Sequence, residues 1–374
     1  MGGMNGQWLG RYTGTNSGTL VIELDDIGTH YEGQVFAWDD NHAQPSAWAS
    51  VKTTGKEAAV HLRVQLSPID PRTGAPTTWN QLASLFPNVV FPSYADVDFE
   101  FAGETLKVSW RTNIETSGSA EITRSKAGAP SDYQPRPAVT NWEQFKAHVS
   151  GLEHRRYIFR GQDIPARLRT SFHRTGRADL ARFLREDIQT LHRHLSSRTS
   201  HVFNLNIPDE NGAFFNLVQH HGYPTPLLDW TFSPYVAAFF AYHHFKNSEA
   251  ANAGAEKKVR IFQFDQKAWR AKFLQDPRLN AVRPHFSILE FIAINNHRLV
   301  PQQSVSSLTN VDDIESYIHS LETPQQQYLQ IIDLPLNERP FVMRELSVMG
   351  ITAGSLFPGL DGTCEELRER FFQL

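Results

Sequence analysis

Residues 219–242 read QHHGYPTPLLDWTFSPYVAAFFAY, and this stretch decides how the second half of the chain is interpreted. It starts where a predicted helix ends, because Gly222 suits the left-handed conformation that commonly follows a helix. The next loop contains two prolines, which restrict its backbone. Ser233 and Pro234 then form an N-cap and a first helical position, so we predict a new helix from residue 234 onward.

This loop gathers polar and aromatic side chains. They are Gln219, His220, Tyr223, Thr225, Asp229, Trp230 and Thr231. Polar groups beside aromatic faces on a restrained loop are typical of pockets for nucleotides. The alternative is that Asp229 and Thr231 cap the next helix while His220 faces solvent. No carboxylate stands at the spacing of a metal-binding helix near these histidines, so we predict no metal site.

A second stretch, RRYIFRGQ at residues 155–162, predicts a strand that ends in a turn. Phe159 lies on one strand face, and Arg160 comes at the strand end, just before Gly161. A guanidinium there is well placed to bind a phosphate or a carboxylate with two hydrogen bonds. The alternative is a surface arginine beside a turn glycine. Residues 155–198 hold eleven arginines and four acidic residues, which we interpret mainly as a solvated helix face.

A polar stretch, NHRLVPQQS at residues 296–304, follows the predicted strand FSILEFIAI at residues 286–294. Its candidate binding residues are Arg298, Gln302 and Gln303, since amides can hold a ribose hydroxyl or a base edge. Glu290 within that strand and Glu345 in a later helix are carboxylates among apolar residues. Each is either a catalytic acid or an ion-pair partner, and the stretch itself could be a plain polar loop.

The first 130 residues alternate in the way β-strands do. In TLVIELDD, residues 19–26, apolar side chains recur at every second position, and turn residues separate about eight such runs. We predict an antiparallel β meander, a sandwich or a barrel, followed by a mixed α+β region. The expected domains are a β-rich domain at 1–128, a proline-rich linker at 129–139 and a third segment at 140–374. We expect Trp8, Tyr12, Trp38 and Trp48 to fill the core rather than line a ligand site.

Composition restricts the class of protein further. The 374 residues are 40% hydrophobic and 20% charged with a net charge of −4, which is ordinary for a globular chain and unlike a general nucleic-acid coating protein. The single cysteine, Cys364, excludes an intramolecular disulfide. The sequence shows neither signal-peptide features nor an apolar run of membrane-spanning length. We therefore expect a cytoplasmic protein without membrane contact.

Four blocks in order resemble the FRG domain, a family named for its Phe-Arg-Gly motif. They are YIFRGQ at 157–162, the stretch at 219–242, NHRLVPQQS at 296–304 and ITAGSLFPGLDG at 351–362. The resemblance covers about residues 140–374. It departs from the family at Pro226, where a basic residue is frequent, and at Ser304, where glycine is frequent.

The resemblance implies a function. FRG proteins occur in bacteria and phages, some of them in defence or toxin systems, and the block order is similar to the ADP-ribosyltransferase fold. This similarity implies NAD as the substrate, an ADP-ribosyltransferase or NAD glycohydrolase activity, and the β-rich domain as a sensor or regulator. A protein or a nucleic acid would accept any transferred group. The alternative is a non-catalytic module that binds a nucleotide or nucleic acid.

The resemblance also implies roles for residues. Arg160 would hold the pyrophosphate or a ribose, and Tyr223 or Trp230 would stack on a base. Glu290, Glu345 or Gln303 would stabilise the positive charge that develops on the ribose. The remaining ligand-binding residues would be Phe159, Gly161, Gln219, His220, Thr225, Asp229, Thr231, Arg298 and Gln302.

Overall fold

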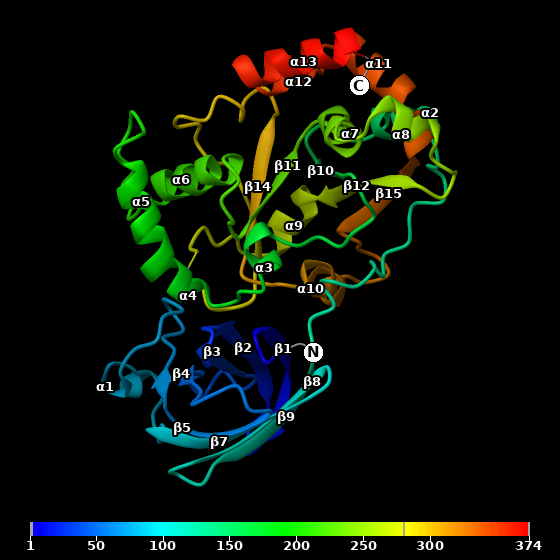
Figure 1. The fold of residues 1–374 in the computed structure, drawn as a ribbon. Coiled ribbons are helices and arrows are strands. Elements are labelled where there is room, and N and C mark those ends of the chain that lie inside the picture. The colour runs from blue at the N-terminus through cyan, green and yellow to red at the C-terminus, as the bar shows by residue number, and fades with distance from the viewer. Residues whose placement is uncertain (1–2, 280, 373–374) are drawn as a thin grey trace.

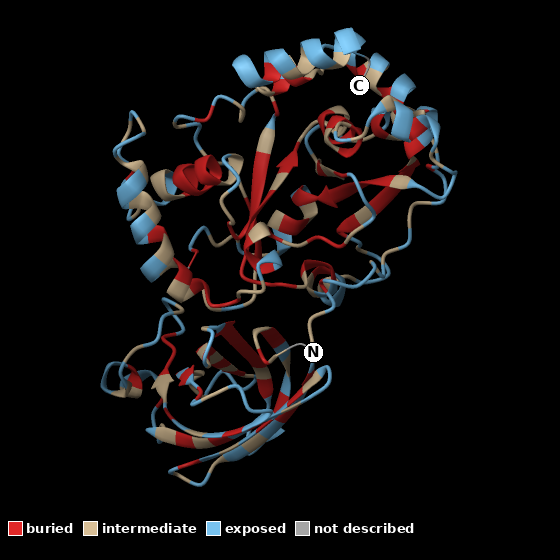
Figure 2. Ribbon diagram, viewed as in Figure 1, coloured by how far each residue is buried: buried red, intermediate tan, exposed pale blue. Residues whose placement is uncertain are grey.

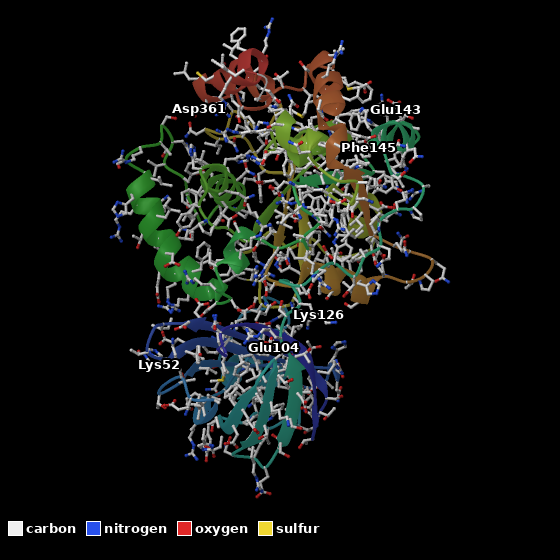
Figure 3. All side chains as sticks on the ribbon, turned by 45° about the vertical axis from the view of Figure 1, so that its right-hand side comes forward. Lys52, Glu104, Lys126, Glu143, Phe145 and Asp361 are labelled. Carbon is white, nitrogen blue, oxygen red and sulfur yellow. The ribbon has the colours of Figure 1, made fainter. Side chains whose placement is uncertain are left out.

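The computed structural model describes residues 3–279 and 281–372, which form two β-sheets with most helices around the second sheet (Figure 1). The sheet of the N-terminal half lies below the other in that view, and the chain passes between the two parts near Lys126 (Figure 3). The mixed α+β class predicted from the sequence is confirmed.

The first sheet is antiparallel and nearly closed, with strand order β5-β7-β8-β9-β1-β2-β3-β4-β6. Its strands are β1 (Gly6–Gly14), β2 (Gly18–Asp26), β3 (Tyr31–Asp39), β4 (Ala47–Lys52), β5 (Ala59–Gln65), β6 (Ser67–Pro68), β7 (Tyr94–Ala102), β8 (Thr105–Thr112) and β9 (Ser117–Thr123). Two short helices, α1 (Trp79–Leu82) and η1 (Ala83–Leu85), precede β7. The period-two pattern explains this sheet, because Leu20, Ile22 and Leu24 all face its interior.

The second sheet has the order β13-β14-β11-β10-β12-β15. Its strands are β10 (Tyr157–Gln162), β11 (Leu227–Thr231), β12 (Lys258–Asp265), β13 (Phe286–Leu289), β14 (Ser304–Thr309) and β15 (Leu329–Pro335). The first helices around it are α2 (Trp142–Ser150), α3 (Ser171–Arg174), α4 (Leu180–Arg182), the π-helical η2 (Phe183–Ile188), α5 (Gln189–Leu195), α6 (Pro208–His220) and α7 (Pro234–Tyr242). The others are α8 (Asn247–Ala251), α9 (Gln266–Lys272), α10 (Ile314–Leu321), η3 (Leu336–Glu338), α11 (Arg339–Val348), α12 (Ala353–Leu356) and α13 (Leu360–Phe372).

Burial follows this layering. The strands of the second sheet and helix α7 are largely buried, whereas α13 and much of α5 face solvent (Figure 2). Among the described residues, no helix combines the length and the apolar character that a membrane crossing needs.

The middle of the second sheet is split. Strand β10 pairs with β12 over six positions and β11 pairs with β14 over five, but β10 and β11 share only the pair Phe159↔Thr231. Beyond this pair the ends of the two strands carry Gly161 and Asp229 without a further ladder pair. The sheet therefore consists of two halves, and the gap between them is the feature that positions the site.

Helix α7 packs closely on β10 because residue 161 is a glycine. A Cβ atom at Gly161 would overlap the carbonyl oxygen of Ala237 and lie 2.7 Å from the backbone nitrogen of Ala241. The helix begins as predicted, since the side chain of its N-cap residue Ser233 accepts a hydrogen bond from the Val236 nitrogen. Gly222 has a φ of +82°, so its predicted left-handed conformation is also confirmed.

Two sequence predictions were wrong. The run FSILEFIAI is a strand only over Phe286–Leu289, so Glu290 comes after the strand rather than within it. The segment Leu227–Thr231, predicted as part of a loop, is strand β11. Pairing with β14 supplies its backbone hydrogen bonds, and such a partner far along the chain leaves no local sequence signal.

The outer face of β1–β3 packs against the second half of the chain. The Gln7 amide donates to the Glu23 carboxylate at 3.0 Å and to the Asn310 carbonyl at 2.6 Å. The Gln7 side-chain oxygen accepts from the Asp312 nitrogen at 2.9 Å. Asp312 in turn pairs with Arg169 at 2.6 Å, so the first sheet is connected to an arginine beside the split strands.

Candidate functional site

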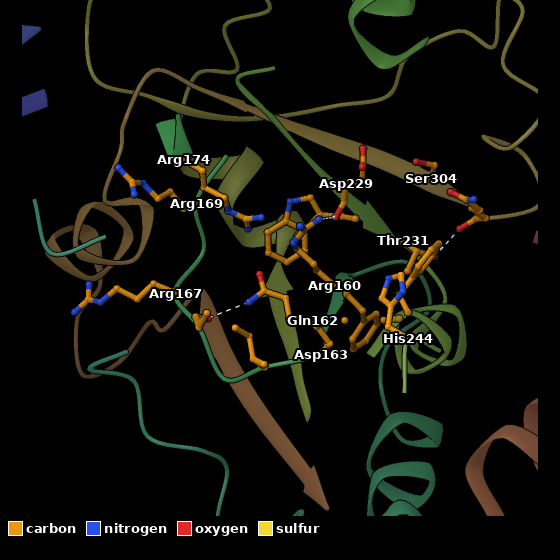
Figure 4. A pocket seen from close by; sticks show the side chains of 18 of the residues that line it. Arg160, Gln162, Asp163, Arg167, Arg169, Arg174, Asp229, Thr231, His244 and Ser304 are labelled. Carbon is orange, nitrogen blue, oxygen red and sulfur yellow. Dashed lines mark hydrogen bonds between the residues drawn. The ribbon is translucent and has the colours of Figure 1, made fainter. Parts of the chain in front are cut away.

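A cavity of about 690 Å³ occupies the gap between β10 and β11 (Figure 4). This volume lies within the usual range for small-molecule sites. The end of β10 and the residues after it form one wall, and β11 forms another. Residues 127–129 of the proline-rich segment, helix α7, and residues 298–304 and 357 complete the lining.

Five arginines line this cavity: Arg160, Arg167, Arg169, Arg174 and Arg298. Two of them are neutralised by neighbouring carboxylates. Arg167 pairs with Asp132 at 2.6 Å and Asp313 at 3.0 Å, and Arg169 pairs with Asp312. The other three make no ion pair within 4.0 Å in the part of the chain that the structure describes. Asp163 and Asp229 also line the cavity, so two carboxylates stand against these three arginines and the lining keeps a small excess of positive charge.

Arg160 is held across the split. Its Nη1 donates to the backbone carbonyl of Asp229 at 2.7 Å, while its Nε is buried and has no partner among the described residues. Burial lowers the pKa of Arg160 to about 10, the Asp229 carboxylate opposes this change, and the charge of Arg174 adds to it. At pH 7 Arg160 is still charged, although it lacks the ion pair that usually offsets burial of a charge.

The guanidinium group of Arg174 repels those of Arg160 and Arg169. Partial burial lowers the pKa of Arg174, the positive charge of Arg169 lowers it further, and the Asp163 carboxylate opposes both effects. Figure 4 shows Arg160, Arg169 and Arg174 on one side of the cavity, with Asp229 close to Arg160. An anion between them would relieve this repulsion, and a phosphate can accept hydrogen bonds from more than one guanidinium.

Two further buried polar atoms at this cavity lack partners among the described residues, Asp229 Oδ1 and Gln162 Oε1. Buried polar atoms are ordinarily hydrogen-bonded, so their presence beside the Arg160 Nε indicates a site that a ligand completes. His220 adds a basic atom. Its Nδ1 donates to the Asn216 carbonyl at 2.7 Å, which leaves Nε2 as the acceptor of the neutral ring.

The four sequence blocks meet around the cavity. Arg160 of the first block bonds the backbone of Asp229 in the second, and the Thr231 hydroxyl donates to the Gln302 carbonyl at 2.7 Å. The Gln302 amide donates to the Leu356 carbonyl of the fourth block at 3.0 Å. Arg298 lies 5.2 Å from the ring centre of Phe357. Residues separated by up to two hundred positions are thus assembled into one site.

Nine of the predicted site residues line the cavity. They are Phe159, Arg160, Gly161, His220, Asp229, Trp230, Thr231, Arg298 and Gln302. Trp230 does not offer a free ring, because it is only 2% exposed, its indole N–H donates to Ser307 at 2.9 Å, and it packs on Phe264 and Phe286. The aromatic rings that could contact a ligand belong instead to Phe240 and Phe357.

The three residues predicted to stabilise ribose charge lie outside this cavity. Glu290 is half exposed and pairs with Arg155 at 3.4 Å and Arg270 at 3.5 Å. Glu345 accepts hydrogen bonds from the Trp142 indole at 2.7 Å and from Lys146 at 2.6 Å. Gln303 has an exposed side chain, its backbone carbonyl accepts from the Phe232 nitrogen at 3.1 Å, and its backbone nitrogen donates to the Val300 carbonyl at 3.0 Å.

Three other predicted ligand residues support the loop before β11. The buried Thr225 hydroxyl donates to the Gln219 side chain, and the Thr225 nitrogen donates to the Ser171 hydroxyl at 2.9 Å. The Tyr223 ring stacks on Phe183 at 6.2 Å. These contacts fix where β11 begins, and hence where Asp229 lies.

Sequence reasoning missed the arginines at 167, 169 and 174, together with His244 and Phe240. The signal was present in the arginine-rich run, which we interpreted mainly as a solvated helix face. The three arginines instead lie between β10 and α4, where the chain folds over the cavity.

The geometry defines an α+β protein with an arginine-lined cavity in a split antiparallel sheet. Residues 155–250 match the family model of the FRG domain, so the chain contains an FRG domain within its C-terminal two thirds. No curated protein and no solved structure matches the chain. Among the described residues, no three His, Cys, Asp or Glu side chains are grouped closely enough to hold a metal ion.

Proposed function

We propose that the cavity between β10 and β11 binds NAD through its pyrophosphate and cleaves the bond between nicotinamide and ribose. The protein would act as an ADP-ribosyltransferase or NAD glycohydrolase in a bacterial or phage defence or toxin system, with the β-rich region as a sensor or regulator. The observation that supports this proposal most is Arg160, a charged guanidinium in the cavity without a carboxylate partner among the described residues.

The proposal assigns a role to the charged and aromatic residues that line the cavity. Arg160 and Arg174 bind the pyrophosphate, which balances their mutual repulsion. The rings of Phe240 and Phe357 offer apolar faces to a base. The Asp229 carboxylate, whose Oδ1 lacks a partner among the described residues, faces the ribose that acquires positive charge.

The reaction would break one bond and form another. The bond from ribose C1′ to the nicotinamide nitrogen breaks, and its electron pair leaves with nicotinamide, which becomes neutral. Water, or a hydroxyl of an acceptor, forms the new bond to C1′ and releases one proton. Nε2 of His220 is the basic atom of the cavity that can take this proton.

A second function, binding of a nucleotide without cleavage, is favoured by one observation. The three residues predicted to stabilise the charge on the ribose, Glu290, Glu345 and Gln303, all lie outside the cavity. The two functions share the phosphate site and differ in turnover.

Nicotinamide release from NAD separates them. We expect release by the wild-type chain, at least a hundredfold less in Arg160→Ala and in Asp229→Ala, and an unchanged rate in the control Arg63→Ala on β5 of the first sheet. Adding cell extract distinguishes transfer from hydrolysis. Thermal stabilisation by NAD without release would favour the binding function, whereas no release and no stabilisation would contradict both.

A further inference from the structure

A second cavity, of about 180 Å³, lies inside the first sheet. Its walls are inward-facing residues of β1 to β5, β7 and β8, and loop residues close one end. Protein interiors are packed densely, and voids larger than a water molecule are few. A void of this size in the middle of a regular sheet therefore needs a cause in the sequence.

The cause is a cluster of small side chains at one end of the sheet interior. Ala37 and Ala47 are direct neighbours on β3 and β4, and Val35 and Ala49 form the next pair. Ala95 faces them from β7.

The opposite end of the same interior is filled. Trp8 is 1% exposed and packs edge-on against Phe101 at 5.8 Å between ring centres. Leu24 and Tyr31 are buried beside them. At the other end, alanine and valine side chains of β3, β4 and β7 leave a hollow beside the rings of Tyr12, Phe99 and Trp110.

One part of the hollow carries a carboxylate, that of Asp39. The Tyr12 hydroxyl donates to Asp39 Oδ2 at 3.4 Å, a long contact, and the Trp110 ring stands edge-on to Tyr12 at 5.5 Å. Asp39 Oδ1 accepts from the Asn41 nitrogen at 2.8 Å. A carboxylate oxygen with only one long contact can accept a further hydrogen bond, so this part of the hollow suits a ligand that donates one.

The loop residues that line the hollow include four apolar ones, beside polar ones such as Asn16, Gln44 and Thr116. These four are Val89, Val90, Phe91 and Pro92, which precede β7, and Val90 is 70% exposed. An exposed valine beside an apolar hollow gives an apolar molecule a path that avoids charged groups.

From this arrangement we infer that the first sheet binds a compact apolar molecule of one or two fused rings that carries a single hydrogen-bond donor. The ring system occupies the space between the alanines of β3, β4 and β7, and the donor meets Asp39. An apolar cavity of about 150 Å³ in another protein is known to stay dry and to bind benzene, so the volume here is sufficient. The inference is independent of the function proposed for the FRG region.

Indole and benzofuran test it as a matched pair, because they have the same shape and only indole has an N–H donor. Titration calorimetry with the full chain, without NAD, should show indole binding at least fivefold more tightly than benzofuran. Asp39→Asn should weaken indole binding and leave benzofuran unchanged. Equal binding of the two probes would overturn the assignment of the donor to Asp39.

Substitutions that fill the hollow test whether the ligand binds there. Ala49→Leu should reduce binding of both probes at least tenfold. Ala102→Leu is the control, because it adds the same atoms at the exposed end of β7, and it should leave binding unchanged. If Ala49→Leu fails to unfold cooperatively, Ala47→Val makes the same test with a smaller side chain. Binding that persists in a folded filling variant, or no binding by the wild-type chain, would overturn the inference.

Discussion

The cavity of the first sheet and the cavity between β10 and β11 are made in different ways. In the first sheet the ladders between β2 and β3 and between β3 and β4 are continuous, and small apolar side chains leave the space. In the second sheet the central ladder is reduced to the pair Phe159↔Thr231, and an arginine crosses the gap. A hollow made by small side chains is apolar, whereas a split ladder exposes backbone and polar groups to a ligand.

The two cavities also differ in what would stabilise them. Filling the first cavity with a larger apolar side chain improves packing, since voids lose van der Waals contacts. The second cavity concentrates positive charges that repel one another, so it gains from an anion rather than from packing. The following predictions test the packing and the buried charges of the two halves of the chain.

The largest effect is expected from Gly161→Ala. The new Cβ would overlap the Ala237 carbonyl, so α7 must move away from β10, and we expect a loss of about 4 kcal/mol in the free energy of unfolding. Chemical denaturation measures it. Gly128→Ala is the control, because its Cβ meets no atom within 4 Å, and it should be within about 1 kcal/mol of wild type. Similar stabilities of the two variants would contradict the close packing of α7 on β10.

Acid should destabilise the second half of the chain through two histidines, the buried His173 and the partly buried His285. Burial lowers the pKa of His173 to about 4 and that of His285 to about 4. As the pH falls, the unfolded chain binds protons at these histidines near pH 6.5, whereas the folded chain binds them only near pH 4. The free energy of unfolding is therefore unaffected above about pH 6.5 and decreases between about pH 6.5 and 4. Each histidine accounts for up to about 3 kcal/mol.

Denaturation across this pH range, with and without His173→Gln and His285→Gln, measures the effect. Both substitutions should flatten the pH dependence. An equally steep dependence in the double variant would contradict the presence of neutral histidines in the folded chain.

The first sheet should show the opposite pH response at Glu23. Burial raises the pKa of Glu23 well above its usual range, and the charge of Asp179 adds to this, while the hydrogen bond from Gln7 opposes it. Its folded-state pKa is raised, so the stability it contributes is present at low pH and is lost as the pH rises from about 4 through the folded pKa. Glu23→Gln should therefore raise stability at pH 7 by about 1 kcal/mol or more. A less stable variant at pH 7 and equal stability at pH 4 would contradict this account.

The smallest change in stability is expected from Arg160→Met. The variant loses one hydrogen bond to the Asp229 carbonyl but also removes a buried charge, so we expect a change below about 1.5 kcal/mol. The control is Arg260→Met, where two 2.8 Å hydrogen bonds to the buried Asp333 are lost. That variant should lose about 3–5 kcal/mol, because Asp333 is left unpaired. A comparable loss in Arg160→Met would make Arg160 a structural residue.

Much of the fold could be predicted because its signals are local. The alternation in residues 19–26, the Ser233 cap and the left-handed Gly222 each depend on neighbours along the chain. The split between β10 and β11 has no such signal, since it depends on partners far apart in sequence.

The errors at the candidate site have the same origin. Residues 227–231 were not recognised as a strand. The alternation of side chains along a strand places Trp230 with Leu228 in the core, and because this was missed, a core tryptophan was assigned a ligand role. Glu290 was placed inside a strand because the apolar run continues past Leu289, where pairing with β14 ends. The arginines after β10 were recognisable as a charged run, but their convergence on Arg160 is a tertiary property.

The central claim is that Arg160 is present for a phosphate-bearing ligand rather than for stability. The most direct test is calorimetric titration of NAD and of ADP-ribose into wild type and Arg160→Met, with unfolding measured on the same samples. We predict that Arg160→Met weakens binding of both ligands at least a hundredfold while its stability stays close to that of wild type. Equal binding by the two proteins, or loss of binding only together with unfolding, would contradict the claim.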